Sequence, residues 1–196
     1  MEGLIPMINM RYLLFLKKLG FTPNIFYDIG SSDGRWSMIM QHIFTNIKCY
    51  TFDADNKSSA KFKVCLSNKD GDIIKFYRHN EHVSSYFLCN NESCDIYDEL
   101  NTYKLDTFVN EYSLEQPNVI KINCCGAEKD IIEGALNTIK QCKYLIVTLN
   151  NYEIFTDAPI AKEVGPYIES LGFDMVDALD NSGLGIVDYI FKNKNL

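Results

Sequence analysis

The stretch Asn24–Ser37, NIFYDIGSSDGRWS, decides the fold of this chain. The mainly apolar run Ile25–Ile29 predicts a short buried strand. A turn bounded by Gly30 and Gly34 follows it and leads into a segment from Arg35 that is typical of a helix. Glycine lacks a Cβ, so the backbone can turn sharply here and approach a ligand closely. A strand, a tight turn and a helix form the first half of a βαβ unit, whose usual ligand site lies at the carboxyl end of the strand.

The chemistry of this turn indicates which ligand it suits. The dinucleotide fingerprint G-x-G-x-x-G would require a second glycine where Ser32 stands. Asp28 and Asp33 add negative charge, which is unfavourable beside a pyrophosphate, so a nicotinamide-dependent oxidoreductase is disfavoured. A ligand with a cationic end fits better, and S-adenosylmethionine carries both a sulfonium and an ammonium group. The turn therefore favours S-adenosylmethionine as the cofactor.

A second acid follows the next predicted strand. The run Lys48–Phe52 ends at Asp53, where an acid can accept hydrogen bonds from both hydroxyls of a ribose. Charge-assisted hydrogen bonds of this kind contribute about 1.5–3 kcal/mol each. The alternative is that Asp28 and Asp53 only cap helices or close turns. Taken together with the glycine-bounded turn, the two acids favour a cofactor site.

Length and charge narrow the classes of function. A chain of 196 residues is expected to form one domain, 1–196, with residues 1–22 as an N-terminal helical segment packed on the core. The net charge of −7 gives a polyanion no general attraction, so no nucleic-acid partner is expected. The apolar segment Met1–Leu19 is interrupted by charged residues and lacks a signal-peptide cleavage site, so no membrane span is expected. The oligomeric state is left open.

Seven cysteines, an odd number, are typical of small buried side chains in a reducing compartment, and a cytoplasmic location is expected. One group of residues is a candidate zinc site: His79, His82, Cys89 and Cys94. Its C-x-x-x-x-C spacing is wider than that of the usual zinc pairs. Loop histidines and scattered thiols are the favoured interpretation, and no metal is predicted.

Along the rest of the chain, predicted strands alternate with predicted helices. This order predicts a mainly parallel sheet with helices on both faces. Residues Arg78–Asn101 show no clear period and are predicted to form a lid or substrate loop. The predicted strands are Lys61–Leu66, Ile73–Tyr77 (as an added hairpin), Val119–Asn123, Tyr144–Leu149, Met175–Val176 and Tyr189–Phe191. The predicted helices are Arg11–Leu19, Arg35–Phe44, Thr107–Tyr112, Ala127–Ile139 and Ile160–Leu171.

Several of these segments together resemble one protein family. YDIGSSDGRWS is similar to the first motif of the FkbM-type methyltransferases, and TFDAD stands where that family has its ribose-binding acid. VCLSNKDGDIIKFY, VSSYF and YKLDTFV resemble its next segments, and VIKINCCGAEKDIIEGA resembles its motif K-I-D-x-E-G-A-E. LGF and DYIF are similar to its closing strands, so the resemblance covers most of the chain beyond Asn24.

The resemblance implies a Rossmann-like class I methyltransferase fold, with a seven-stranded, mostly parallel sheet and a small hairpin insertion. It also implies an S-adenosylmethionine-dependent O-methyltransferase whose acceptor is a sugar, a glycan or a similar small hydroxyl compound. The residues implied to bind the cofactor are Asp28, Gly30, Ser31, Ser32, Asp33, Gly34, Asp53, Ala54, Cys65, Leu66, Ser67, Ser85 and Asn123. Lys121, Asn123 and Glu128 are implied to act in catalysis, facing the transferred methyl group. Glu128, His79 or His82 is considered as a substitute base.

Three departures from the family pattern concern acids. Asn123 stands where the family has aspartate, Cys125 where it has glutamate, and Thr148 where it commonly has another glutamate. An asparagine cannot act as a general base, and losing a positioned base lowers the rate about 10²–10⁴-fold. A catalytically weakened or inactive relative, which keeps the fold to bind the cofactor or partners, is therefore the alternative function. For Lys121, a role at the acceptor or a pair with Glu128 stands beside a purely structural ion pair.

Overall fold

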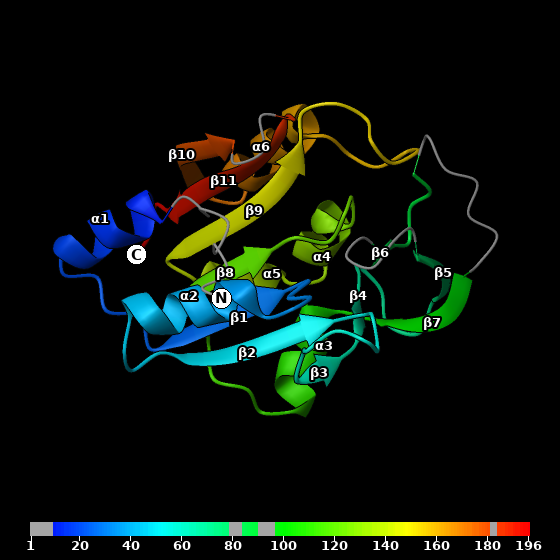
Figure 1. Ribbon diagram of the computed structural model, residues 1–196, viewed down its shortest axis with the longest axis horizontal. Coiled ribbons are helices and arrows are strands. Elements are labelled where there is room, and N and C mark those ends of the chain that lie inside the picture. The colour runs from blue at the N-terminus through cyan, green and yellow to red at the C-terminus, as the bar shows by residue number, and fades with distance from the viewer. Residues whose placement is uncertain (1–9, 79–83, 90–96, 181–183) are drawn as a thin grey trace, which may run out of the picture.

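A seven-stranded sheet forms the centre of the computed structural model, which describes residues 10–78, 84–89, 97–180 and 184–196 (Figure 1). The strand order is β10-β11-β9-β8-β1-β2-β3, and every neighbouring pair is parallel except the two that involve β11. This arrangement confirms the predicted fold class. The strands are β1 (Ile25–Ile29), β2 (Lys48–Asp53), β3 (Phe62–Lys63), β8 (Val119–Ile122), β9 (Tyr144–Asn150), β10 (Phe173–Asp180) and β11 (Ile186–Asn193).

Helices cover both faces of this sheet because its central strands are apolar on both sides. All five residues of β1 are buried, and alternate residues contact opposite layers. Phe26 packs with the helices on one face of the sheet, whereas Tyr27 packs with the helices on the other face. One face carries α1 (Arg11–Lys18) and α2 (Arg35–Ile43); the other carries α3 (Leu105–Glu111), α4 (Glu128–Glu133), α5 (Leu136–Lys140) and α6 (Ala161–Ser170).

The single helix predicted over Ala127–Ile139 is divided into α4 and α5 at Gly134. The backbone at Gly134 passes very close to the backbone at Ser67. A Cβ on Gly134 would lie 2.0 Å from the carbonyl oxygen of Ser67. The carboxylate of Asp106 then accepts hydrogen bonds from the backbone N–H groups of Asn137 (2.9 Å) and Thr138 (2.8 Å) at the start of α5. A tertiary contact and a cap from another helix therefore interrupt a pattern that reads as continuous in the sequence.

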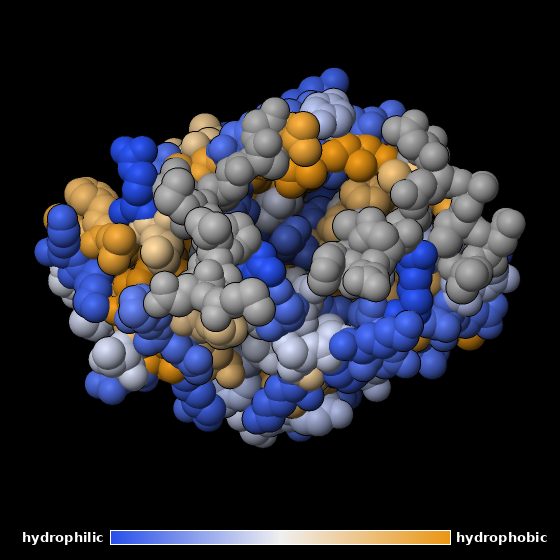
Figure 2. All heavy atoms as spheres, viewed as in Figure 1, coloured by the Kyte–Doolittle hydropathy of each residue, from blue (hydrophilic) through white to orange (hydrophobic). Residues whose placement is uncertain are grey.

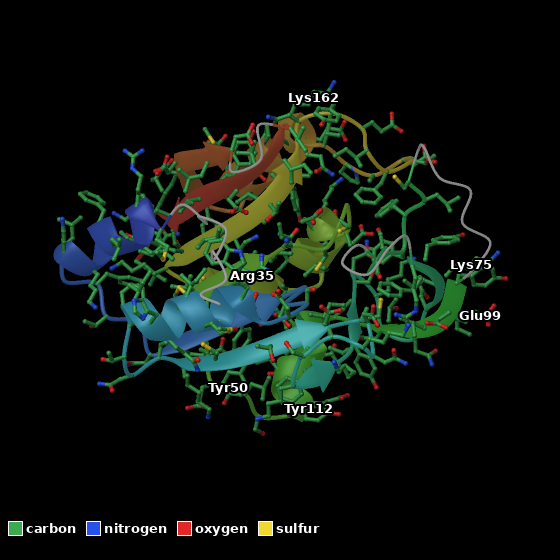
Figure 3. The ribbon with its side chains drawn as sticks, viewed as in Figure 1. Arg35, Tyr50, Lys75, Glu99, Tyr112 and Lys162 are labelled. Carbon is green, nitrogen blue, oxygen red and sulfur yellow. The ribbon has the colours of Figure 1, made fainter. Side chains whose placement is uncertain are left out.

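A second, four-stranded sheet replaces the predicted hairpin. Its order is β4-β7-β5-β6, with β4 (Cys65–Leu66), β5 (Ile73–Arg78), β6 (Ser84–Ser85) and β7 (Tyr97–Tyr103). The predicted strand Lys61–Leu66 divides between the two sheets, and β5 pairs with β7 rather than with that strand. Strand β7 lies partly in the segment predicted as an aperiodic loop. Its side chains lack alternation, and cross-strand pairs such as Lys75 with Glu99 accompany its pairing with β5 (Figure 3).

Among the described helices, none combines the length and the apolar character that crossing a membrane requires.

The close contact at Gly134 predicts a pair of contrasting alanine variants. Gly134→Ala should lower the free energy of unfolding by about 1–3 kcal/mol, because the added methyl group meets backbone rather than a movable side chain. Gly165→Ala in α6 is the matched control, since nothing lies within 4 Å of its added Cβ. It should stabilise the protein by about 0.5–1 kcal/mol. Urea denaturation of both variants provides the measurement, and equal effects would contradict the proposed contact.

Candidate functional site

A cavity of about 800 Å³ opens at the carboxyl ends of β1, β2 and β8 and extends to the second sheet. The view in Figure 2 shows that this face of the molecule is hollowed near its middle. Many of the predicted cofactor-binding residues line the cavity: Gly30, Ser32, Asp33, Asp53, Ala54, Cys65, Leu66, Ser85 and Asn123. Segments far apart in the sequence therefore meet at one site, at the place where open α/β sheets bind ligands.

Gly30 allows the turn after β1 to pass between two strand ends. Its backbone has φ +74°, and its N–H donates to the carbonyl of Phe52 at the end of β2 (2.9 Å). A Cβ at this position would lie 1.9 Å from the carbonyl oxygen of Asn123 at the end of β8. Only glycine fits where these two backbone segments pass each other. Because Gly30 has no side chain, its backbone lines the cavity directly.

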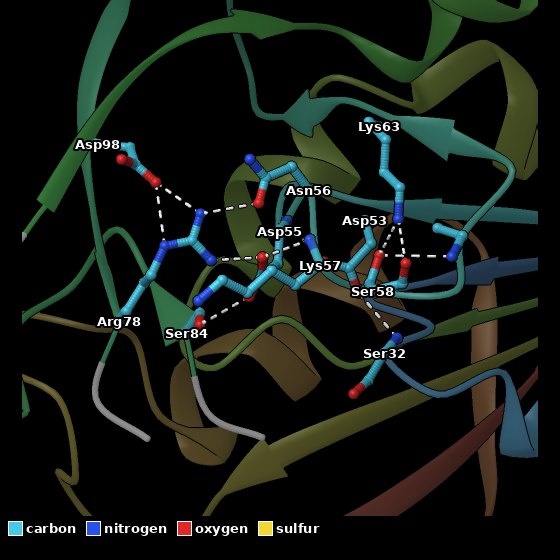
Figure 4. Close-up of polar contacts among 11 residues, drawn as sticks. Ser32, Asp53, Asp55, Asn56, Lys57, Ser58, Lys63, Arg78, Ser84 and Asp98 are labelled. Carbon is cyan, nitrogen blue, oxygen red and sulfur yellow. Dashed lines mark hydrogen bonds and ion pairs between the residues drawn. The ribbon is translucent and has the colours of Figure 1, made fainter. Parts of the chain in front are cut away.

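Asp53 lines the cavity and also organises its rim (Figure 4). One carboxylate oxygen accepts the N–H of Ser32 (2.8 Å) and the other accepts the N–H of Asp55 (2.8 Å). A carboxylate offers about four acceptor positions, so these two bonds leave capacity for the hydroxyls of a ribose. Burial raises the pKa of Asp53, while the two backbone hydrogen bonds oppose that rise. Asp53 therefore closes the turns at Ser32 and Asp55, as the alternative interpretation expects, and also lines the cavity.

Sequence reasoning missed a further wall of the cavity, which begins beside Asp53. Arg78, at the end of β5, forms ion pairs with Asp55 after β2 and with Asp98 of β7 (2.6 Å), as Figure 4 shows. Both Arg78 and Asp55 line the cavity. Arg78 was assigned only to the start of the predicted loop, because nothing in the local sequence shows that β5 passes beside the end of β2. The aromatic side chains of Phe76 and Tyr86 complete this wall.

Four predicted cofactor residues do not line the cavity: Asp28, Ser31, Gly34 and Ser67. Asp28 is 1% exposed, and its carboxylate accepts hydrogen bonds from the backbone N–H (3.0 Å) and the hydroxyl (2.7 Å) of Ser37 in α2. It therefore holds the helix that follows the turn. Burial raises the pKa of Asp28 to about 6, although the bonds from Ser37 and the charge of Lys121 lower it. Ser31 Oγ is buried without a hydrogen-bond partner within the described chain.

Glu128 holds the turn after β8 through hydrogen bonds to the backbone. It is 3% exposed, and its two oxygens accept the backbone N–H groups of Cys124 (2.7 Å) and Gly126 (3.0 Å). These bonds shape the turn between β8 and α4, in which Cys125 has φ +51°. Burial raises the pKa of Glu128. The side chain therefore holds a turn that lines the cavity, and it is not itself among the lining residues.

Lys121 is fully buried and pairs with an acid of the last strand, β11. Its ammonium group lies 3.2 Å from Asp188 of β11, contacts the hydroxyl of Thr148 in β9 and donates to the carbonyl of Ile122 (3.1 Å). The pair considered with Glu128 is not the one formed. The sequence did not reveal Asp188 as the partner of Lys121, because only the strand order of the sheet places β11 beside β9.

The remaining sequence candidates concern thiols and histidines. Cys124 and Cys125 line the cavity, and burial raises the pKa of both thiols, which opposes thiolate chemistry. His79, His82 and Cys94 lie outside the described residues. Within the residues that the structure does describe, no three His, Cys, Asp or Glu side chains are grouped as metal ligands.

The raised pKa of Asp28 predicts how stability depends on pH. An acid with a higher pKa in the folded state binds more protons when folded, so its contribution is complete below pH 3.8 and is lost as the pH rises through about 6. The difference corresponds to about 3 kcal/mol. Asp28→Asn should therefore gain stability relative to the unaltered protein between pH 4 and pH 7, as measured by urea denaturation. The same stability difference at both pH values would contradict this environment for Asp28.

Comparison with known proteins identifies the family. The family model described as the methyltransferase FkbM domain matches residues 28–175. The structure of the FkbM methyltransferase from Methylobacillus flagellatus KT is similar, with a TM-score of 0.57 and 11% sequence identity. The match covers 87% of this chain and 43% of that one, so this chain spans less than half the length of that protein.

A second similar structure is the precorrin-6y C5,15-methyltransferase from Geobacter metallireducens GS-15. Its TM-score is 0.52 and its identity is 14%, with 99% of this chain and 92% of that chain covered. At such identities the likeness shows the fold alone. A search of curated proteins finds no significant match. The family model covers most of the chain, and its match begins at Asp28 and includes the cavity residues at the carboxyl ends of β2 and β8, so this chain belongs to the FkbM methyltransferase family.

Proposed function

We propose that this protein binds S-adenosylmethionine in the cavity and transfers its methyl group to a hydroxyl of a sugar, a glycan or a similar small acceptor. The carrying observation is that Gly30, Asp53 and Asn123, at the ends of three neighbouring strands, line one cavity within the family domain. The choice of a hydroxyl acceptor rests on the resemblance to FkbM-type enzymes.

The cavity residues fit this cofactor chemically. Asp53 offers acceptor positions for the ribose hydroxyls, and the close backbone at Gly30 leaves room for the methionine portion. The side chains of Leu66, Phe76 and Ile131 supply an apolar region suited to the adenine ring of the cofactor. When bound, the cofactor would supply an activated methyl group on a sulfonium.

The protein's own contribution to transfer is positioning. Asn123 would stand beside the sulfonium end, where its amide can orient groups but cannot accept a proton. Aligning the acceptor oxygen with the methyl carbon can contribute about 7–11 kcal/mol to lowering the barrier in well-oriented reactions. The turn held by Glu128 and the helix held by Asp28 keep this end of the site rigid.

A second candidate function is a methyltransferase-fold protein that binds the cofactor or a partner without turnover. It is favoured by one observation: Asp28 of β1 and Glu128 at the start of α4 are both engaged in structural hydrogen bonds, and neither lines the cavity. This candidate predicts cofactor binding without methyl transfer to any acceptor.

Isothermal titration with S-adenosylmethionine and S-adenosylhomocysteine tests the proposed cofactor site. The protein should bind both, and Asp53→Ala should raise each Kd about 10- to 100-fold because two charge-assisted hydrogen bonds are lost. Asp174→Ala is the control, since Asp174 is an exposed acid of β10 paired with Lys194. Binding of neither compound by the folded, unaltered protein would refute the proposal.

Asn123→Asp separates the two candidate functions. If the chain is a weakened enzyme, the restored carboxylate should raise the release of S-adenosylhomocysteine in the presence of a sugar acceptor about 10²-fold or more. Cofactor affinity should change much less. Efficient transfer by the unaltered protein would instead eliminate the non-catalytic candidate.

A further inference from the structure

A continuous row of polar contacts follows the rim of the cavity from the second sheet to the turn after β1 (Figure 4). Arg78 of β5 forms an ion pair with Asp55, which follows β2. The backbone N–H of Asp55 donates to the carboxylate of Asp53 at 2.8 Å, and the other oxygen of that carboxylate accepts the N–H of Ser32 at 2.8 Å. All four residues line the cavity. The row therefore joins three separate segments along one edge of the cavity.

The outer end of the row is anchored in the second sheet. The guanidinium of Arg78 also donates to Asp98 of β7, from Nε at 3.0 Å and from a second nitrogen at 2.6 Å. Among the described residues of β7, which include Asp98, none lines the cavity. A guanidinium that contacts two acids is held in one orientation, because its donors have a fixed planar geometry. Arg78 therefore links the rim of the cavity to a strand that lies outside it.

The inner end of the row holds a turn with an uncommon backbone conformation. Ser32 has φ +46°, in the left-handed region that residues other than glycine rarely adopt. Its N–H donates to Asp53, and its carbonyl accepts the backbone N–H (2.7 Å) and the hydroxyl (3.0 Å) of Ser59. A conformation of this kind persists only where its surroundings hold it. The orientation of the Asp53 carboxylate and the shape of this turn therefore depend on each other.

Arg78 also balances the charges of the row. Asp53 and Asp55 are two acids separated by one residue. Burial raises the pKa of Asp53, and the negative charge of Asp55 adds to this rise. Burial acts on Asp55 in the same direction, but the hydrogen bonds from Lys57 and Arg78 lower the pKa of Asp55 overall. The ion pair thus keeps Asp55 ionised without leaving its charge uncompensated beside Asp53.

We propose that Arg78 is a positioning residue for the cofactor, acting through Asp55 on the carboxylate of Asp53. This inference rests on the proposed function, in which Asp53 receives the ribose hydroxyls. Because Arg78 fixes Asp55, the N–H of Asp55 holds one oxygen of Asp53, and the carboxylate is oriented before the cofactor arrives. A group that is already held in its bound orientation loses less conformational entropy on binding. The second sheet therefore contributes to the affinity for the cofactor through the end of β2.

The same row couples the cofactor to β7. Coupling between two sites is reciprocal, so if the ion pairs of Arg78 favour cofactor binding, bound cofactor must favour these ion pairs. The effect should reach β7 through Asp98. A cofactor bound at the end of β2 is therefore expected to slow the exchange of backbone amide hydrogens in β7.

Titration of Arg78→Met with S-adenosylhomocysteine tests the proposal. This compound lacks the sulfonium charge, so its affinity reports on the adenosine portion without that attraction. Arg78→Met should raise the Kd about 5- to 50-fold. Arg78→Lys should recover part of the loss, because it restores the charge but not the planar fork. The matched control is Lys48→Met, which removes a cation paired with Glu115 at the amino end of β2 and should leave the Kd unchanged. An unchanged Kd in folded Arg78→Met would overturn the assignment.

A double-mutant cycle separates positioning through Asp55 from a direct contact between Arg78 and the ligand. If Arg78 acts through Asp55, Arg78→Met should change the Kd less than about twofold in a protein that already carries Asp55→Ala. Additive losses from the two substitutions would show that Arg78 affects the ligand by another route, and they would refute the proposed role.

Hydrogen exchange followed by mass spectrometry gives a readout that a purely structural role of Arg78 would not move. In the unaltered protein, S-adenosylhomocysteine should slow exchange in peptides that cover Tyr97–Tyr103 of β7. In Arg78→Met this ligand-dependent difference should disappear. Each variant is compared at saturating ligand, so weaker binding does not account for the loss. A difference of the same size in Arg78→Met would contradict the coupling.

The design separates the possible failures. If Arg78→Met does not fold, Asp55→Asn removes the charge of the same ion pair and keeps the backbone N–H that Asp53 accepts. This variant should raise the Kd about fivefold or more, and unaltered affinity would refute the role of the ion pair. If the unaltered protein binds neither S-adenosylmethionine nor S-adenosylhomocysteine, the proposed function itself fails, which the titrations reveal before any Arg78 variant is compared.

Discussion

The close crossing of the backbone at Gly30 is the constraint on which the rest of the site depends. The N–H groups of Gly30 and Ser31 both donate to the carbonyl of Phe52, and the N–H of Asn123 donates to the carbonyl of Ile29. These bonds tie together the carboxyl ends of three strands. Because a Cβ at position 30 would overlap the carbonyl of Asn123, the junction requires glycine. The cavity exists because this junction leaves backbone, and no side chain, at its centre.

Two kinds of support surround the junction. Buried acids hold it from within: Asp28 binds the start of α2, and Glu128 binds the turn after β8. An ion-pair cluster holds it from outside, because Arg78 connects the second sheet to Asp55 after β2. The residues that the sequence assigned to the site are therefore of two kinds. Some line the cavity, and others hold its walls in place.

The neutral side chains at Asn123 and Thr148 have a physical consequence for the carboxyl edge of the sheet. Asn123 and Thr148 leave the ends of β8 and β9 without negative charge, yet Lys121 remains fully buried between them. An ammonium group in that position requires a counter-charge, and β11 supplies it through Asp188. The neutral side chains of Asn123 and Thr148 and the Lys121–Asp188 ion pair are therefore parts of one electrostatic arrangement.

The sequence by itself determined the fold class, because the alternation of apolar strands with helical segments and the turn after β1 are local patterns. Most of the residues that the sequence assigned to the cofactor also line the cavity, since strand ends and a glycine-bounded turn can be located along the chain. Only the tertiary structure decided the division of the helix at Gly134, the second sheet built on β7, and the partners Arg78–Asp55 and Lys121–Asp188. Each of these depends on which distant segments lie side by side. Local periodicity carries no information about that, because strand order is set by packing and backbone pairing between segments far apart in the sequence.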